Sequence, residues 1–373
     1  NSIKNFITGD NQFDLISESA NLTENRSASY SPNFSYSDLN TRFTYLLTPK
    51  NTLSISFSAG RDSIKEKREF YGFEDMFSFD STLTDQKTYW GNQGVNLNWS
   101  KYWNHTFKSR LVISNYKYLS NYESKQKALV SNNFVSVGTF HEKNRLSNNR
   151  IEFQTNYIGL KNHKVELGAG ASEYQISLRN KITDGISDTT YWINQNSFSP
   201  FFYLQDKWIK PKNFTLETGL RIFYFSSFSK VFYEPRLAII KSISDKFSID
   251  ASVGRYSQYI HQFVNGYSTR GSDGMWILSD TDIPIISSVN YHLGANWDYN
   301  NFFINTEAYY KTTDNLNTFY NETDPLSSSL RKILSGSGNA NGIELLIRKK
   351  TGKMKGWISY LLSKTTYEFP DIN

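Results

Sequence analysis

Among the side chains of this 373-residue chain, the histidines are the first candidates to consider for metal binding or catalysis. None of them has a second histidine or a cysteine at the short spacing that a metal site uses. The chain also contains no cysteine, which excludes disulfides, cysteine-based zinc sites and thiol catalysis. No nucleophile is paired with a base in the sequence, so we expect neither an enzyme nor a resident cofactor or metal. The five histidines are His105, His141, His163, His261 and His292.

Two short segments suggest ligands by their composition. "GSGNANG" (336–342) is glycine-rich, but a phosphate loop would continue with Lys-Ser or Lys-Thr into a helix, and this segment leads into an apparent strand. "SDTDIP" (279–284) lies near Asp273 and gathers carboxylates that could suit calcium in the loop 273–282. The regular ligand spacing of known calcium loops is missing, so a solvated acidic loop is the preferred interpretation and calcium the alternative.

The segment 261–284 interleaves aromatic and polar side chains. On an exposed loop this mixture suits the capture of a solute. The alternative is that the same side chains order the loop itself, since loops both carry function and pack on themselves. The candidate ligand residues are His261, Phe263, Tyr267, Arg270 and Trp276.

The elements that must position these segments are strands, because apolar and polar residues alternate with period two while helical periodicity is weak. In "VNYHLGANWDY" (289–299) the odd positions are apolar and the even positions are polar or small. "FTLETGLRIFYF" (214–225) and "RIEFQTNY" (150–157) alternate in the same way. Each of these strands therefore has one apolar and one polar face.

The turn signals are of two kinds, and the two kinds alternate along the chain. Hairpin-length clusters of Pro, Gly, Asn and Asp stand at 48–51, 103–105, 160–163, 210–213, 244–246, 299–301 and 350–354. Polar segments, all but one of them long, separate these clusters near 67–88, 122–142, 181–196, 227–231, 261–284 and 314–336. This order predicts seven hairpins, or about fourteen strands, with the tight turns at one end of the sheet and the long loops at the other.

Such a meander is typical of an outer-membrane β-barrel, whose apolar face meets lipid and whose polar face lines the lumen. A hydrophobic content of 38% with 16% aromatic residues fits that arrangement. No apolar stretch reaches the eighteen residues of a membrane-spanning helix. The 41 basic and 35 acidic residues are spread along the chain, which argues against nucleic acid. The alternative is a soluble antiparallel β protein, which usually has turns every 8–12 residues at both ends.

Aromatic residues next to the short turns would form an interfacial girdle at that end of the barrel. They are Trp103, Trp208, Trp297 and Tyr299. The alternating pattern also places charged side chains on the polar, lumen-facing side of the strands. They include Glu217, Arg221, Arg236 and Glu307.

Several hairpins carry a family likeness, and their order is more specific than any one of them. They are "YWGNQGVNLNWSKYWN" (89–104), "FSPFFYLQDKWIKPKNFTLETGLRI" (198–222), "YEPRLAI" (233–239) and "NGIELLIRKKTGKMKGWISYLLSK" (341–364). In this order they resemble the barrel of TonB-dependent outer-membrane receptors, especially the Bacteroidota group that has a carboxypeptidase-regulatory-like domain ahead of the plug. The likeness covers nearly the whole chain.

The resemblance implies active uptake of a scarce solute, such as a siderophore, cobalamin, an oligosaccharide or a peptide, across the cell outer membrane of a Gram-negative bacterium. The partners it implies are outer-membrane lipid, the receptor's own plug domain, TonB of the inner-membrane energising complex, the solute and a surface lipoprotein. It does not choose among the solutes. The alternatives are a passive channel without a plug, and a soluble or surface β protein that binds glycans through its loops.

The resemblance also sets the expected boundaries. Residues 1–32 match the end of an early barrel strand and an extracellular loop, and residues 33–373 match the middle section of the barrel. About fourteen strands of a 22-stranded barrel are then present, so we expect an open sheet whose first and last strands are not paired with each other. In a plugged barrel the inward Arg221 and Arg236 would contact the plug, because a guanidinium makes forked contacts; hydration of these charges is the alternative.

Overall fold

The computed structural model describes residues 28–71, 81–130, 133–183, 188–210, 213–263, 274–322 and 330–370. These residues form strands and connecting turns, and no helix among them is long and apolar enough to cross a membrane. The strands are β1 (Ala28–Thr48), β2 (Asn51–Tyr71), β3 (Ser81–Tyr102), β4 (Phe107–Val130), β5 (Asn133–Tyr157), β6 (His163–Thr183), β7 (Asp188–Lys210), β8 (Phe214–Phe225), β9 (Lys230–Ser244), β10 (Phe247–Gln258), β11 (Ile260–Phe263), β12 (Met275–Leu278), β13 (Ile286–Tyr299), β14 (Phe302–Glu322), β15 (Leu330–Lys349) and β16 (Gly356–Glu368).

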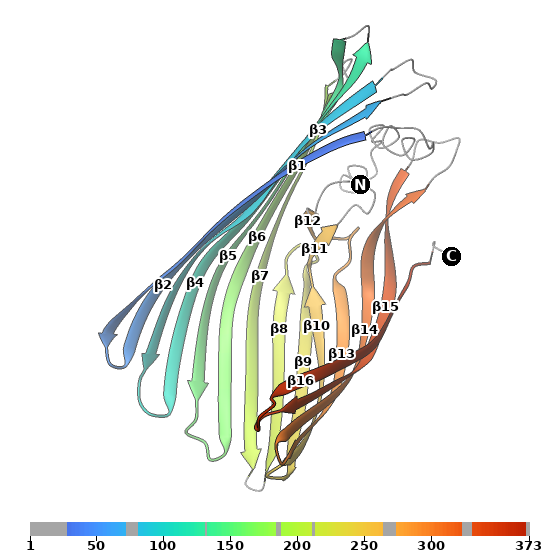
Figure 1. The fold of residues 1–373 in the computed structure, drawn as a ribbon. Coiled ribbons are helices and arrows are strands. Elements are labelled where there is room, and N and C mark those ends of the chain that lie inside the picture. The colour runs from blue at the N-terminus through green and yellow to red at the C-terminus, as the bar shows by residue number, and fades with distance from the viewer. Residues whose placement is uncertain are drawn as a thin grey trace.

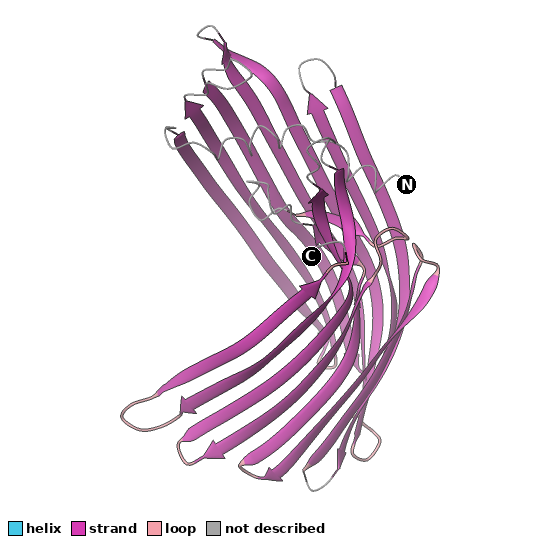
Figure 2. Cartoon of the chain, turned by 90° about the vertical axis from the view of Figure 1, so that its right-hand side faces the viewer, coloured by secondary structure: helices cyan, strands magenta, loops and turns pink. Residues whose placement is uncertain are grey.

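Fourteen of these strands form one antiparallel sheet in which neighbours in sequence are neighbours in space, from β1 to β10 and then from β13 to β16. The sheet curls like a trough (Figures 1 and 2). The two outer strands, β1 and β16, are not hydrogen-bonded to each other. This confirms the predicted all-β, up-and-down partial barrel with an open sheet.

All seven predicted short turns connect successive strands at the same end of the sheet, the lower end in Figure 1. Several turns contain a residue in the left-handed region, where asparagine and glycine are tolerated best: Asn162 (φ 68°), Asn300 (φ 49°) and Gly352 (φ 111°). In another turn the side-chain oxygen of Asn104 accepts hydrogen bonds from the backbone N–H groups of Thr106 and Phe107, both at 2.8 Å. Residues within the turns themselves therefore determine the turn conformations.

The opposite end differs from the prediction. The segments 67–88, 122–142, 181–196 and 314–336 were expected to be long irregular loops, and this is wrong, because most of their described residues belong to strands. β4 and β5, for example, have 24 and 25 residues, whereas crossing a bilayer takes about 9–11. Near this end both faces of the strands carry polar side chains, so the alternation disappears from the sequence although the backbone ladder continues. The first described strand begins at Ala28.

The register assigns the two faces of the sheet. Leu220, Leu293 and Ile343 lie on the convex face, and Leu293 keeps 60% of its surface exposed. Polar residues such as Arg221 and His292 alternate with them on the concave face. A soluble protein rarely leaves so large an apolar surface uncovered, and lipid is the solvent that fits it.

The remaining two strands, β11 and β12, form a separate hairpin on the concave side (Figure 1). β12 contacts β5, β6 and β7, which precede it by many residues in the chain. The apolar core of the molecule lies where this hairpin meets the sheet. It contains Tyr174, Ile176, Phe201, Phe223, Phe225, Leu278 and Ile285.

Candidate functional site

Two carboxamide side chains on the sheet hold the backbone of β12. Asn144 of β5 donates to the carbonyl of Trp276 at 3.1 Å and accepts from the Trp276 N–H at 2.8 Å. Gln195 of β7 does the same with Leu278, at 3.0 Å and 2.9 Å. Each carboxamide therefore replaces one residue of a neighbouring strand. Because a buried edge strand must pair its backbone groups, these two side chains fix both the position and the register of the hairpin.

The interior of the joint between the hairpin and the sheet is buried. The imidazole Nε2 of His261 lies 2.5 Å from the Ser279 hydroxyl, and both residues are buried. Burial lowers the pKa of His261 to about 4, so this histidine is neutral at physiological pH. Nearby, the hydroxyl groups of Tyr174 and Tyr259 lie 2.9 Å apart, and their rings meet edge to face.

The acidic residues after β12 close a turn. One carboxylate oxygen of Asp280 accepts from the backbone N–H groups of Asp282 and Ile283, at 2.9 Å and 3.0 Å. Within the described ranges, no group of three or more His, Asp or Glu side chains gathers as metal ligands would. Asp273 lies outside the described residues. The carboxylate of Asp280 therefore serves the fold of the hairpin in this structure.

A network of arginines and carboxylates covers the concave wall next to the hairpin. Glu234 is 3% exposed, and one of its oxygens lies 3.6 Å from both the Arg221 and the Arg236 guanidinium groups. Its other oxygen accepts from the backbone N–H of Ser257 at 2.9 Å. One buried carboxylate thus links two arginines that come from different strands.

The network continues onto β5 and β7. Arg150 pairs with Glu152 at 2.7 Å, and the Tyr203 hydroxyl donates to the other oxygen of Glu152 at 3.0 Å. The Phe201 ring lies between two guanidinium carbons, 4.4 Å from that of Arg150 and 5.0 Å from that of Arg221. A cavity of about 250 Å³ opens over this wall. The wall therefore presents fixed donors and acceptors to whatever occupies the concave side.

The four lumen-facing candidates lie on the concave face but do not form one cluster. Arg221 and Arg236 meet through Glu234, whereas Glu217 pairs with Lys207 nearer the turn end. Glu307 belongs to another group and lies 3.4 Å from His292. Sequence analysis did not single out Glu234. The available signal was "YEPR", which puts a glutamate two residues before an arginine on the same strand face.

The five ligand-loop candidates are distributed between the hairpin and the undescribed part of the chain. His261 and Trp276 lie in the hairpin; the His261 imidazole is buried, and the Trp276 ring meets Tyr118 edge to face at 6.0 Å. Phe263 pairs with Met275 in the β11–β12 ladder. Tyr267 and Arg270 lie outside the described residues. At His261 the structure favours the alternative interpretation, in which the side chain orders the loop.

The four girdle candidates all lie at the end with the short turns. Trp103 is in the turn after β3, and its indole N–H donates to Ser109 at 3.0 Å. Trp208 and Trp297 lie on the convex face close to their turns. The rings of Trp297 and Tyr299 are 5.1 Å apart.

Comparison with known proteins finds one family and several solved structures of similar fold. The family described as TonB dependent receptor-like, beta-barrel matches residues 11–372. No curated protein matches the sequence. Many solved structures are similar, among them the following three. The outer membrane transporter YddB from Escherichia coli has a TM-score of 0.53 and 11% identity, over 90% of this chain and 55% of that one. The copper transporter OprC has a TM-score of 0.52 and 10% identity, over 91% and 62%.

The third is the RagAB peptide importer, with a TM-score of 0.51 and 10% identity over 92% of this chain and 49% of that one. At such identities the likeness shows the fold alone. The chain spans between 49% and 62% of the length of these three neighbours.

Proposed function

Because the chain belongs to the TonB dependent receptor-like β-barrel family, we propose that it forms part of the wall of an outer-membrane receptor that takes up a scarce solute. The observation that carries this proposal is the two-sided sheet. Its convex face is apolar and suits lipid, while its concave face holds an ordered network of charges that suits a filled lumen. The cell outer membrane of a Gram-negative bacterium is the location that follows.

In this proposal the arginine network is a contact surface for a plug domain. Glu234 holds Arg221 and Arg236 in place, and their remaining N–H groups can donate to carbonyl or carboxylate groups of the plug. Contacts of this kind are specific in geometry, yet they can be exchanged for water when the plug moves. That property suits a domain that TonB must displace, with energy from the inner membrane.

The hairpin β11–β12 would narrow the lumen above the plug. Its backbone is fixed by Asn144 and Gln195, so it presents a constant shape to an incoming solute. Siderophores, cobalamin, oligosaccharides and peptides all remain candidates for that solute. A Bacteroidota-type receptor with an additional N-terminal domain and a surface lipoprotein partner is the finer form of the proposal.

The test uses the full-length gene product in its own bacterium. Deletion of the gene should abolish high-affinity uptake of one solute class, and the complemented strain should lose that uptake again when the proton gradient is collapsed. Membrane fractionation should place the protein in the outer membrane. If uptake persists without the gradient, or if the purified receptor conducts ions steadily in planar bilayers, a passive channel is the correct function.

A further inference from the structure

The side chains on the convex face of β2 to β7 change from apolar to polar along the strands. The strand register aligns side chains in transverse rows, each row two residues further from the short turns than the one before. One row is apolar and contains Leu97, Ile113 and Ile151. The next row is polar on β4 to β6, where it contains Asn115, Asn149 and Glu173, and apolar at Val95 and Phe198 on the flanking strands. The apolar surface therefore ends at a defined level on these three central strands.

That level is marked by a line of hydrogen bonds between side chains. Asn115 donates to Asn149 at 2.5 Å, and Asn149 donates to Glu173 at 3.2 Å. Gln175, in the following row, donates to the other oxygen of Glu173 at 3.1 Å. The line crosses three strands on the outer surface, and it separates the region that suits acyl chains from the region that suits head groups.

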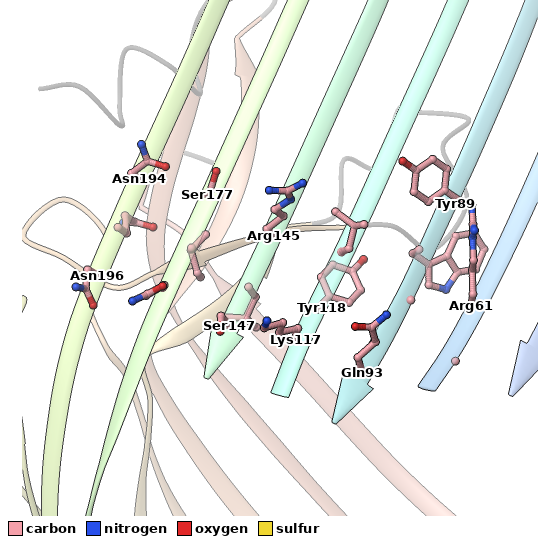
Figure 3. A pocket seen from close by; sticks show the side chains of 18 residues that line it. Arg61, Tyr89, Gln93, Lys117, Tyr118, Arg145, Ser147, Ser177, Asn194 and Asn196 are labelled. Atoms are coloured by element: carbon pink, nitrogen blue, oxygen red, sulfur yellow. The ribbon is translucent and has the colours of Figure 1, made fainter. Parts of the chain in front are cut away.

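Two grooves meet at this line. The lower groove has a volume of about 430 Å³ and is lined by Val95, Leu97, Ile113, Ile151 and Phe198. The upper groove has a volume of about 880 Å³, and its lining includes the polar side chains of Arg61, Gln93, Lys117 and Arg145 beside apolar residues such as Leu119 (Figure 3). An elongated amphiphile could lie along both, with its apolar part below and its polar part above.

The upper groove is positively charged. Arg61, Lys117 and Arg145 are exposed, and within the described part of the chain no ion pair neutralises any of them. Arg61 lies over the Tyr89 ring at 4.9 Å. Further along the strands on the same face, Lys125 and Lys181 are paired with Glu123 and Asp188.

The spacing of Arg61, Lys117 and Arg145 indicates how many phosphates the ligand carries. Lys117 and Arg145 are diagonal neighbours on β4 and β5, at a separation of about 7–8 Å, so a single phosphate can contact both. Arg61 lies three strands from Arg145, on the order of 14 Å away. Between them Gly91 forms the floor, where a Cβ atom would come within 2.4 Å of the Gly60 carbonyl oxygen. A head group with two phosphates can therefore engage all three cations.

We propose that this convex groove is a binding site for a phosphate-bearing anionic membrane lipid, with an acyl chain in the lower groove and the phosphates between Arg61, Lys117 and Arg145. The site rests on one part of the proposed function, the contact of the convex face with a membrane, and not on the uptake of a solute. It lies on the opposite side of the sheet from the solute path. The bound lipid would stabilise the long strands where they leave the apolar layer.

The experiment measures lipid bound to the purified full-length receptor in detergent by native mass spectrometry. The probes are cardiolipin with two phosphates, phosphatidylglycerol with one, and zwitterionic phosphatidylcholine. We expect one tightly retained lipid, with retention falling in that order. The triple substitution Arg61→Gln, Lys117→Gln and Arg145→Gln should weaken cardiolipin binding about tenfold or more. Ile113→Trp, which fills the lower groove without changing charge, should also weaken it.

The matched control replaces three ion-paired lysines on the same face, in the triple substitution Lys67→Gln, Lys125→Gln and Lys181→Gln. It removes the same formal charge and should leave cardiolipin binding unchanged. Equal losses in the two triple variants would reduce the effect to general charge attraction and overturn the site, as would full binding by the groove variant. The single substitution Lys117→Gln decides the matter if the triple variant does not fold. Lipid retention without solute uptake would reject the proposed function and keep the site.

Discussion

The side chain of Asn144 on β5 and the backbone of Trp276 on β12 exchange two hydrogen bonds, at 2.8 Å and 3.1 Å, across 132 residues of sequence. Asn144 is 1% exposed. A buried carboxamide that pairs like a strand residue is difficult to replace, because the partner N–H and C=O groups lose both hydrogen bonds together. Asn144 is therefore one of the residues that anchor the backbone of the inner hairpin.

Replacement of Asn144 by alanine should release the hairpin from the wall. We expect a loss of about 2 kcal/mol, because two buried hydrogen bonds disappear, and hydrogen exchange of the Trp276 and Leu278 amides should become at least tenfold faster. Asn92→Ala is the matched control, since Asn92 is exposed on the same face two strands away. If the Trp276 and Leu278 amides exchange at the same rate in both variants, Asn144 does not anchor the hairpin.

Replacement of Glu234 by glutamine should destabilise the concave wall. The two guanidinium groups would lose their shared carboxylate, and the expected loss is roughly 1–3 kcal/mol, less than for a fully buried pair because Arg236 is partly exposed. The measurement is the urea midpoint of unfolding of the full-length receptor. Glu217→Gln breaks a more exposed pair and should shift the midpoint less. A larger shift in the Glu217 variant would contradict the assigned role of Glu234.

Docking of the hairpin should depend on pH through His261. Burial lowers its pKa from 6.5 to about 4, so the undocked state binds a proton more readily than the docked one. The free energy that favours docking is then largest above pH 6.5. It decreases by up to about 3 kcal/mol as the pH falls from 6.5 towards 4. Protection of the hairpin from protease should follow this curve.

The variant His261→Asn is the control for the pH experiment, since asparagine can bond to Ser279 without titrating in this range. Its protease sensitivity should be the same at pH 7.5 and pH 5. A variant that keeps the full pH dependence would assign the effect to another group.

The assignment of side chains to the convex and concave faces can be tested by introducing one charged side chain on each face. Leu293→Arg should cost about 2–4 kcal/mol, the cost of an arginine facing the middle of the bilayer from a barrel, because Leu293 points outward about 13 Å along the strand from Trp297. Asn290→Arg on the concave face should cost much less. Folding into lipid vesicles measures both. The chain contains no cysteine, so single cysteines at the two positions can also be labelled from lipid and from water.

The sequence alone determined the local features of this protein. Side chains alternate with period two in every strand, so once one face is apolar the side of each residue follows; Leu293 and His292 are an example. The short turns were also predictable, because residues such as Asn162 and Gly352 adopt left-handed conformations that few others tolerate. The fourteen-strand order, the polar concave face and the positions of Trp208 and Trp297 come from these two signals.

The tertiary structure alone decided which distant residues meet. Nothing in the segment 261–284 indicates that it turns back into the trough to pair with Asn144 and Gln195, and nothing near Glu234 indicates that Arg221 will share its carboxylate. The ends of β4 and β5 could not be predicted from the sequence for a similar reason. Polar side chains on both faces remove the period-two pattern, while the backbone pairing continues. Such contacts depend on the curvature of the whole sheet, which brings strands together in a way that no local pattern encodes.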